Sequence, residues 1–389
     1  MILRILFFLA VILSLPLWGI DRMSLRHVLC KPLRWALAIP NLILFLALVG
    51  MAINESYTTE AMYWKGVVLT WTLCIAIPET VVALLMTLGN LAKRGSWVRR
   101  GVHVLSWIAG LVVLGTLLYG FTQGCEKVVV KDYRYLSSKL PQSFDDYRIV
   151  QLSDLHLGTF NGDTRIVERV IDSVNACRPD LVVFTGDLVN TTAQELADFI
   201  PAFSRIQSRD GIISVMGNHD YAHYYGWEDP ADSLRDVQLL ERQQREMGWT
   251  LLLNENVVLH RGNDSIAIVG VENDGRPPFP ALGDLDKAQF HLQENCFKVL
   301  LSHDPSHWRR SVLPETNIDL TLSGHTHGMQ FMLGDFSPAS WFYPEWGGEY
   351  RLEDGRALYV SLGAGEALLP FRFGAWPEVN LIILNKNND

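Results

Sequence analysis

Charged residues are scarce in this sequence. Asp, Glu, Lys and Arg make up 19% of the 389 residues, whereas hydrophobic residues make up 49%, and the mean hydropathy is +0.12. A typical soluble domain contains about 25% charged residues. The composition therefore excludes a single ordinary soluble domain and indicates a membrane portion.

Closely spaced cysteines are absent as well. The five cysteines, Cys30, Cys74, Cys125, Cys177 and Cys296, contain no C-x-x-C pair. Zinc ribbons and small disulfide frameworks are recognised by such spacings. Both are excluded, and we interpret the cysteines as free, buried thiols.

Positive charge is missing from most of the chain. Residues 1–126 contain 10 Lys and Arg against 5 Asp and Glu, so their net charge is +5, and the remaining residues carry −14. A nucleic-acid-binding domain needs a basic surface that neutralises phosphates. The acidic part excludes such a partner and fits a domain whose carboxylates bind metals or solvent.

Long apolar stretches are what the first third does contain. They cover residues 5–20, 35–53, 66–88 and 101–121, and a membrane span needs about 20 residues. Arg4 precedes the first stretch as in a secretory signal, but no small-x-small cleavage site follows before Asp21. We therefore predict a membrane domain over 1–126 with four transmembrane helices, embedded in the lipid bilayer of the inner cell membrane.

Basic residues between the spans predict the orientation. Four lie in loop 21–34 and four in loop 89–100, whereas loop 54–65 has only Lys65. Loops rich in Lys and Arg stay in the cytoplasm. We therefore expect the chain to start outside, cross four times and place everything after residue 121 on the outer, periplasmic side.

Glu79, after Pro78 in the third stretch, is an ionisable residue within a predicted span. Such residues are costly in hydrocarbon and often functional. A Glu packed among helices beside a proline kink is the alternative, and the sequence leaves both open.

Beyond a linker at 127–145, residues 146–389 alternate short β-branched runs with helical patterns at 164–177 and 231–247. This alternation predicts an α/β domain. Each apolar run ends in polar residues that could bind a metal, and ligands beyond strand ends meet in one crevice. They are Asp154 and His156, then Asp187, then Asn218, His219 and Asp220, then His303, and finally His325 and His327.

The residue types suit a site with two cations. Asp154 and His156 are two residues apart, so in an extended segment both side chains point to one side. Asp187 offers two oxygens and could bridge two cations. A single polar residue at a strand end is more often structural, but five histidines share this setting. Nitrogen and oxygen ligands without thiolates favour Mn, Fe, Zn or Co over a soft metal.

These motifs resemble those of the calcineurin-like metallophosphoesterases. The blocks D-x-H, G-D, G-N-H-D, a later His and G-H-T-H all occur, in that order, at Asp154, Gly186, Gly217, His303 and Gly324. Within the family, GHTHG followed by Gln330 and the late stretch YVSLGAGEALLPFRFGAWPEV look most like the bacterial membrane-associated branch, which includes UDP-2,3-diacylglucosamine hydrolase-type enzymes. Met329 departs from the Gly often found there.

The resemblance implies a four-layer αββα sandwich and two divalent metals, with Mn²⁺ expected first and Fe, Zn, Co or Mg as alternatives. It implies that His219 protonates the leaving oxygen or stabilises the transition state, and that Asp220 orients the His219 imidazole. The two implied ligand sets share one residue: Asp154, His156, Asp187 and His327 for one metal, and Asp187, Asn218, His303 and His325 for the other.

Two aromatic clusters, 221–227 and 341–346, follow the predicted ligands. They are expected either near the site, where apolar pockets hold acyl chains, or over the domain's own core.

Our first hypothesis is a membrane-anchored binuclear metal hydrolase of a phosphoester or pyrophosphate bond in a phosphorylated small molecule or lipid-linked substrate. The alternative is a membrane sensor or scaffold that binds a ligand without turnover, although such proteins usually lose ligands and none is missing here.

Overall fold

The computed structural model describes residues 14–23, 25, 29–53, 59–93, 95–367 and 369–387. They divide into two compact units, Met1–Gln123 and Gly124–Asp389. Each unit is described by itself below.

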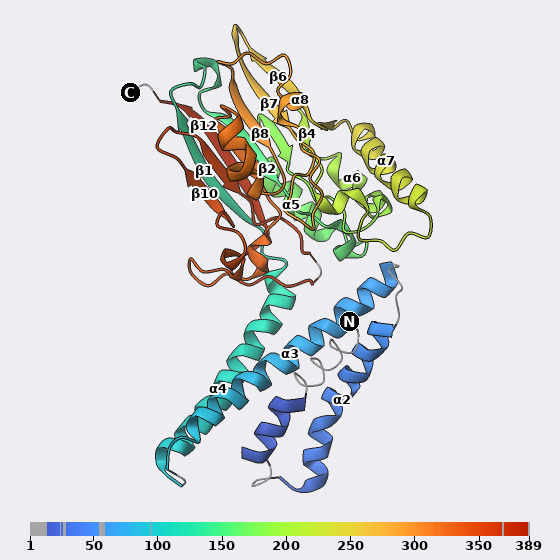
Figure 1. The fold of residues 1–389 in the computed structure, drawn as a ribbon, viewed down its shortest axis with the longest axis vertical. Helices are drawn as coiled ribbons and strands as arrows, with labels where there is room; N and C mark the ends of the chain where they lie inside the picture. The colour runs from blue at the N-terminus through green and yellow to red at the C-terminus, as the bar shows by residue number, and fades with distance from the viewer. Residues whose placement is uncertain are drawn as a thin grey trace. The chain divides into compact units, whose positions relative to one another are not determined.

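The first unit is helical (Figure 1). Its long helices are α2 (Lys31–Ile53), α3 (Thr59–Gly89) and α4 (Trp97–Tyr119), and α4 continues into a π-helical turn, η2 (Gly120–Gly124). Among the described residues, three helices are long and apolar enough to cross a membrane, over Lys31–Met51, Tyr63–Gly89 and Trp97–Gly124. They coincide with the second, third and fourth predicted spans.

The first predicted span, 5–20, lies mostly outside the described residues, although residues 14–23 are helical. Glu79 has a polar partner in this unit, because Asn41 Nδ2 in α2 donates a hydrogen bond of 2.8 Å to Glu79 Oε2 in α3.

The second unit contains two six-stranded sheets (Figure 1). The first has the order β1 (Val129–Ser137), β12 (Glu378–Lys386), β2 (Tyr147–Leu152), β3 (Leu181–Phe184), β4 (Ile212–Ser214), β5 (Thr250–Leu251). The second has the order β10 (Gly348–Arg351), β11 (Ala357–Val360), β9 (Leu320–Ser323), β8 (Phe297–Leu301), β7 (Asp264–Gly270), β6 (Glu255–Arg261). Strands β2, β3 and β4 are parallel neighbours, as are β7, β8 and β9.

Three buried apolar clusters show that these elements form four layers. Alternate residues of one strand point to opposite faces, so in β3 Leu181 packs between the sheets while Val182 packs against helices. The first sheet is covered by α5 (Arg165–Ala176), α6 (Ile200–Phe203) and α7 (Pro230–Glu246). The second is covered by α8 (Leu285–Ala288), η7 (Trp308–Val312) and α9 (Leu313–Glu315). The predicted αββα fold and its two predicted helices are confirmed.

The expectation of a linker over 127–145 is wrong. Strand β1 lies within that range and pairs in parallel with β12 along its full length, from Val129 opposite Glu378 to Ser137 opposite Lys386. Tyr133 and Tyr135 project from β1 into the core between the sheets. The second unit, which begins at Gly124, therefore reaches its first strand at Val129.

Candidate metal centre

The sequence-predicted site residues converge from five strands. Asp154 and His156 follow β2, Asp187 follows β3, and Asn218, His219 and Asp220 follow β4 in the first sheet. His303 follows β8, and His325 and His327 follow β9 in the second sheet. Three groups among them place one nitrogen or carboxylate oxygen per residue within 4.8 Å of each other: Asp154, His156 and His327; His156, Asp187 and His219; Asp187, His303 and His325.

The backbone is strained at these residues. Asp154, His156, Asp187, His325 and His327 all have positive φ, between 46° and 73°. A left-handed conformation is uncommon for residues with a Cβ, costs of order 1–3 kcal/mol when strained, and clusters at functional sites. Five such residues at one place indicate that the turns are held for the position of their side chains.

Two glycines make these turns possible. A Cβ on Gly217 would lie 2.3 Å from Asp187 Oδ1, and a Cβ on Gly324 would lie 2.2 Å from Asp154 Oδ2. Only glycine leaves room for the carboxylates to approach the neighbouring loop this closely. The G-N-H-D and G-H-T-H motifs therefore need their first residue for space.

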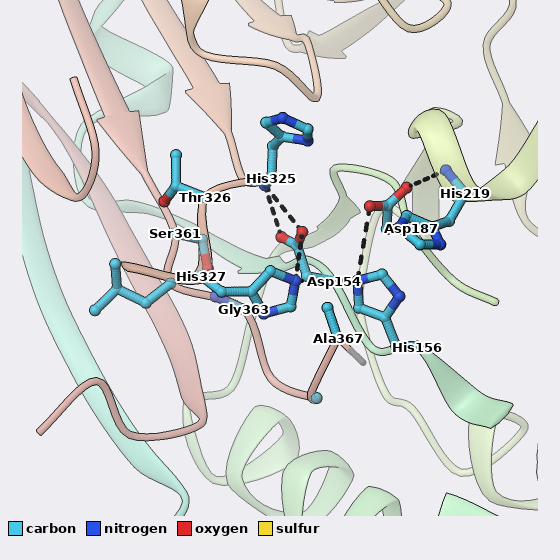
Figure 2. A network of polar contacts seen from close by, with 12 residues as sticks. Asp154, His156, Asp187, His219, His325, Thr326, His327, Ser361, Gly363 and Ala367 are labelled. Atoms are coloured by element: carbon cyan, nitrogen blue, oxygen red, sulfur yellow. Dashed lines mark hydrogen bonds and ion pairs between the residues drawn. The ribbon is translucent and has the colours of Figure 1, made fainter. Parts of the chain in front are cut away.

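The first group centres on the Asp154 carboxylate (Figure 2). It accepts the backbone N–H of His325 at 2.9 Å, and His327 Nε2 lies 3.3 Å from its Oδ1. His156 Nε2 is 3.0 Å from His327 Nε2. The buried guanidinium of Arg372 lies 3.2 Å from His327 Nδ1, so the His327 ring turns its Nε2 towards Asp154 and His156.

Asp187 is shared by the other two groups. Its Oδ2 lies 3.0 Å from His303 Nε2 and 3.6 Å from His156 Nε2. His303 Nδ1 donates to the carbonyl of Thr185 at 2.8 Å, which leaves Nε2 as the ring nitrogen that faces Asp187. His325 Nδ1 lies 3.3 Å from His303 Nε2, and its Nε2 bonds to Tyr343 Oη at 2.8 Å.

Asn218 lines one cavity together with Asp187 and His325. Its Nδ2 donates to Tyr224 Oη at 2.9 Å, whereas its buried Oδ1 has no hydrogen-bond partner among the described residues. Buried polar atoms without a partner are rare in native proteins and call for an explanation such as an ion. An oxygen acceptor on a residue that lines a cavity with Asp187 and His325 suits a hard or borderline cation.

His219 and Asp220 differ from the predicted arrangement. His219 Nδ1 bonds to the carbonyl of Asn190 at 2.7 Å, and its ring stacks on Tyr224 with centroids 4.2 Å apart. Asp220 instead accepts four backbone N–H groups, those of Gly217 and of residues 187–189. The expectation that Asp220 orients the His219 imidazole is therefore wrong, because its carboxylate holds the Asp187 turn in place.

The electrostatics of the site follow from burial and close charges. Burial lowers the pKa of His303, but attraction to Asp187 and their hydrogen bond outweigh it and raise the pKa to about 10. Burial and the neighbouring His219 lower the pKa of His156 well below its usual value. Burial and the charge of Asp187 raise the pKa of Asp220 to about 7. Hydrogen bonds from backbone N–H groups lower this pKa but do not outweigh the two other effects.

A cavity of about 250 Å³ opens onto these residues. Its apolar lining includes Phe279, Met329, Phe342 and Tyr343. Its polar lining is made by Thr326 and six of the predicted site residues, His156, Asp187, Asn218, His219, His325 and His327. Tyr224 and Tyr343 come from the two aromatic clusters, so both clusters reach the site. The roles of Asn190, Thr185 and Arg372 were missed, because the first two act through backbone carbonyls and Arg372 lies 45 residues beyond His327.

Comparison with known proteins places the domain in a family. The family model described as calcineurin-like phosphoesterase matches residues 147–329. The chain is 29% identical to a zebrafish (Danio rerio) protein named transmembrane protein with metallophosphoesterase domain, over 79% of this chain and 69% of that protein. It is also 29% identical to the uncharacterized metallophosphoesterase YkuE of Bacillus subtilis, over 69% of this chain and 91% of that protein.

An uncharacterized metallophosphoesterase of Helicobacter pylori is 30% identical, over 72% of this chain and 70% of that protein. Members of this family use divalent metals, and the groups around Asp154 and Asp187 could hold them. The chain belongs to the calcineurin-like metallophosphoesterase family.

Proposed function

We propose that this protein is a membrane-anchored binuclear hydrolase of a phosphoester or pyrophosphate bond. The observation that carries the proposal is the position of Asp187, whose Oδ2 lies near His156 on one side and His303 on the other. One carboxylate reaching two ligand groups suits a pair of metals about 3.5–4 Å apart. The proposed ligands are Asp154, His156, Asp187 and His327 for one metal, and Asp187, Asn218, His303 and His325 for the other.

The residues present fit such metals. The hydrogen bond from His303 to Thr185 leaves Nε2 unprotonated in the neutral ring, and Asn218 Oδ1 is an acceptor without a partner among the described residues. Histidine ligands are commonly oriented by a backbone carbonyl in this way. The nitrogen and oxygen set makes Mn²⁺ our first choice, with Fe, Zn, Co or Mg as alternatives.

When bound, two divalent ions supply an activated water and neutralise charge that develops on the phosphoryl oxygens. His219 supplies the proton. The Asn190 carbonyl can only accept, so His219 Nδ1 carries a hydrogen and Nε2 is the nitrogen available to the substrate. A protonated Nε2 would donate to the leaving oxygen, which is general acid catalysis. Asp220 acts as a positioning residue through the backbone of the Asp187 turn.

The membrane setting extends the proposal to substrate and location. The apolar helices and relatives named as transmembrane proteins support an anchored enzyme. The loop charges favour the inner membrane with the site on the periplasmic side. We propose a phosphorylated small molecule or a lipid-linked phosphate as substrate. The likeness of the late stretch around Arg372 to UDP-2,3-diacylglucosamine hydrolase-type enzymes supports the second choice.

The test is hydrolysis by the purified full chain with Mn²⁺. The substrates are p-nitrophenyl phosphate, its bis-ester and a lipid pyrophosphate, which separate monoester, diester and pyrophosphate activities. We expect the wild type to hydrolyse at least one of these substrates and Asp187→Asn to hydrolyse none. Tight binding of two metals without turnover of any of the three would favour the sensor or scaffold instead.

A further inference from the structure

A group of large apolar side chains is exposed beside the cavity. Met329, Leu333, Phe336, Trp341 and Phe342, here called the apolar rim, are each between 44% and 72% exposed. Met329 and Phe342 also line the cavity at the candidate metal centre. The rim is therefore continuous with the site. This distinguishes it from the single, scattered apolar residues found on most protein surfaces.

The loop that carries the rim is well ordered by hydrogen bonds. Leu333 and Phe336 exchange backbone hydrogen bonds, of 2.9 and 3.2 Å. Ser337 Oγ donates to the carbonyl of Gly328 at 2.6 Å and accepts from the N–H of Ala339. The rings of Phe336 and Trp341 pack with centroids 5.8 Å apart. The hydrogen-bonded loop thus holds these side chains outward, although water is an unfavourable environment for them.

The same loop is tied to the place where the chain enters the domain. Met332 N–H donates to Phe373 O at 2.7 Å, and Phe373 N–H donates to Gln330 O at 3.0 Å. The adjacent carbonyl, that of Arg372, packs so closely on Gly124 that a Cβ there would lie 1.9 Å from it. Gly124 is the last residue of a candidate membrane span. The rim loop is thus bonded to the segment that packs on the first residue of the domain.

The charge of the loop selects the kind of ligand. Residues 327–346 contain Asp335 and Glu345 but no Lys or Arg. A surface that recognises anionic headgroups needs basic residues. The rim therefore suits hydrocarbon, while the candidate metal centre suits the phosphate.

We propose that the apolar rim binds the hydrocarbon tail of an amphiphilic phosphate whose phosphorus lies at the metal centre. This inference rests on the proposed function and deepens it by naming the substrate class, a phosphorylated lipid. Burial of methylenes against the rim removes apolar surface from water and would favour long chains over short ones.

The experiment compares dodecylphosphonate with butylphosphonate, which carry the same headgroup and are not hydrolysed. Both are titrated calorimetrically into the Mn²⁺-loaded full chain in nanodiscs. The wild type is expected to bind the dodecyl compound at least about tenfold more tightly. Leu333→Ser/Trp341→Ser is expected to reduce this ratio to within about threefold, with the metal content kept.

Leu234→Ser is the matched control, because Leu234 on α7 is 60% exposed but lies outside the rim; it should keep the wild-type ratio. A ratio near one in the wild type would overturn the inference. So would a large ratio that persists in the rim variant, since it would report partition into the nanodisc. Binding needs no turnover, so an inactive protein with the expected ratios would refute hydrolysis and leave the tail site standing.

Discussion

His219 is the residue whose surroundings best separate catalysis from metal binding. Its backbone N–H donates to Asp187 Oδ1 at 2.8 Å, and its ring is fixed between Asn190 and Tyr224. The ring also lies close enough to His156 and Asp187 to be grouped with them as a ligand. Substitution distinguishes a proton donor from a ligand.

His219→Gln is expected to lower kcat by about 10²–10⁴-fold, the usual contribution of a general acid, while the metal content stays the same. Rates for a nitrophenyl and an alkyl ester of the same phosphate check this role. The nitrophenolate leaves without protonation, so its rate should fall much less. Equal losses for both esters, or a loss of metal, would show that His219 is not the proton donor.

The raised pKa of His303 makes metal binding depend on pH. Asp187 raises the pKa of His303 to about 10, although burial lowers it. The metal-free ring is therefore protonated near neutral pH. A metal at Nε2 must displace that proton, so affinity should rise with pH. We expect the Kd for Mn²⁺ to fall by about tenfold per unit between about pH 6 and 8. Titration calorimetry in buffers of different ionisation enthalpy counts the protons released, and a Kd that does not change with pH would contradict this assignment.

At the scale of elements, the strand ends carry the site. Asp154, Asp187 and Asn218 follow parallel neighbours in one sheet, and His303 and His325 follow parallel neighbours in the other. This convergence could be predicted, because apolar runs that end in polar residues are visible in the sequence and parallel strands share an edge.

Strand β1 could not be predicted in the same way. Its partner β12 lies some 250 residues further along the chain, and nothing local in 129–137 records that pairing. The function of Asp220 was hidden for a similar reason, since its four N–H donors come from two separate turns. A side chain that bonds to the backbone of a distant loop produces no characteristic residue spacing in the sequence.

Adjacent residues of β1 test its place in the core. Tyr135 is buried between the sheets and donates a hydrogen bond to the carbonyl of Asp319 at 2.9 Å, whereas Leu136 is 48% exposed. Tyr135→Ala should lower the free energy of unfolding by about 3–5 kcal/mol, as for other large buried side chains, and Leu136→Ala should change it little. Thermal unfolding of both variants checks this. Equal small effects would mean that 127–145 is a linker after all.

At the scale of the whole molecule, a basic apolar part precedes an acidic domain, and the basic loops predict the topology. Long domains cross the membrane largely regardless of their own charge. Loops with Lys and Arg near the span ends, by contrast, tend to stay in the cytoplasm. If the first predicted span is cleaved or does not cross, the basic loops still favour the same side for the domain. We therefore expect the domain outside in all three cases.

Fusions at the C-terminus measure this directly. Alkaline phosphatase joined after residue 389 should be active, and green fluorescent protein at the same place should be dark. The reverse pair of results would place the candidate metal centre in the cytoplasm and overturn the predicted orientation.

The central claim is that two metals joined by Asp187 hydrolyse a phosphate bond. It is tested most directly by measuring hydrolysis of a nitrophenyl phosphate ester against the number of Mn²⁺ ions bound per chain. We predict that turnover appears as the second ion binds. Asp187→Asn, which has less charge between the cations, should neither retain two ions nor turn over, while the exposed Asp172→Asn should behave as the wild type. Two tightly held ions in Asp187→Asn, or full activity with one ion or none in the wild type, would contradict the account.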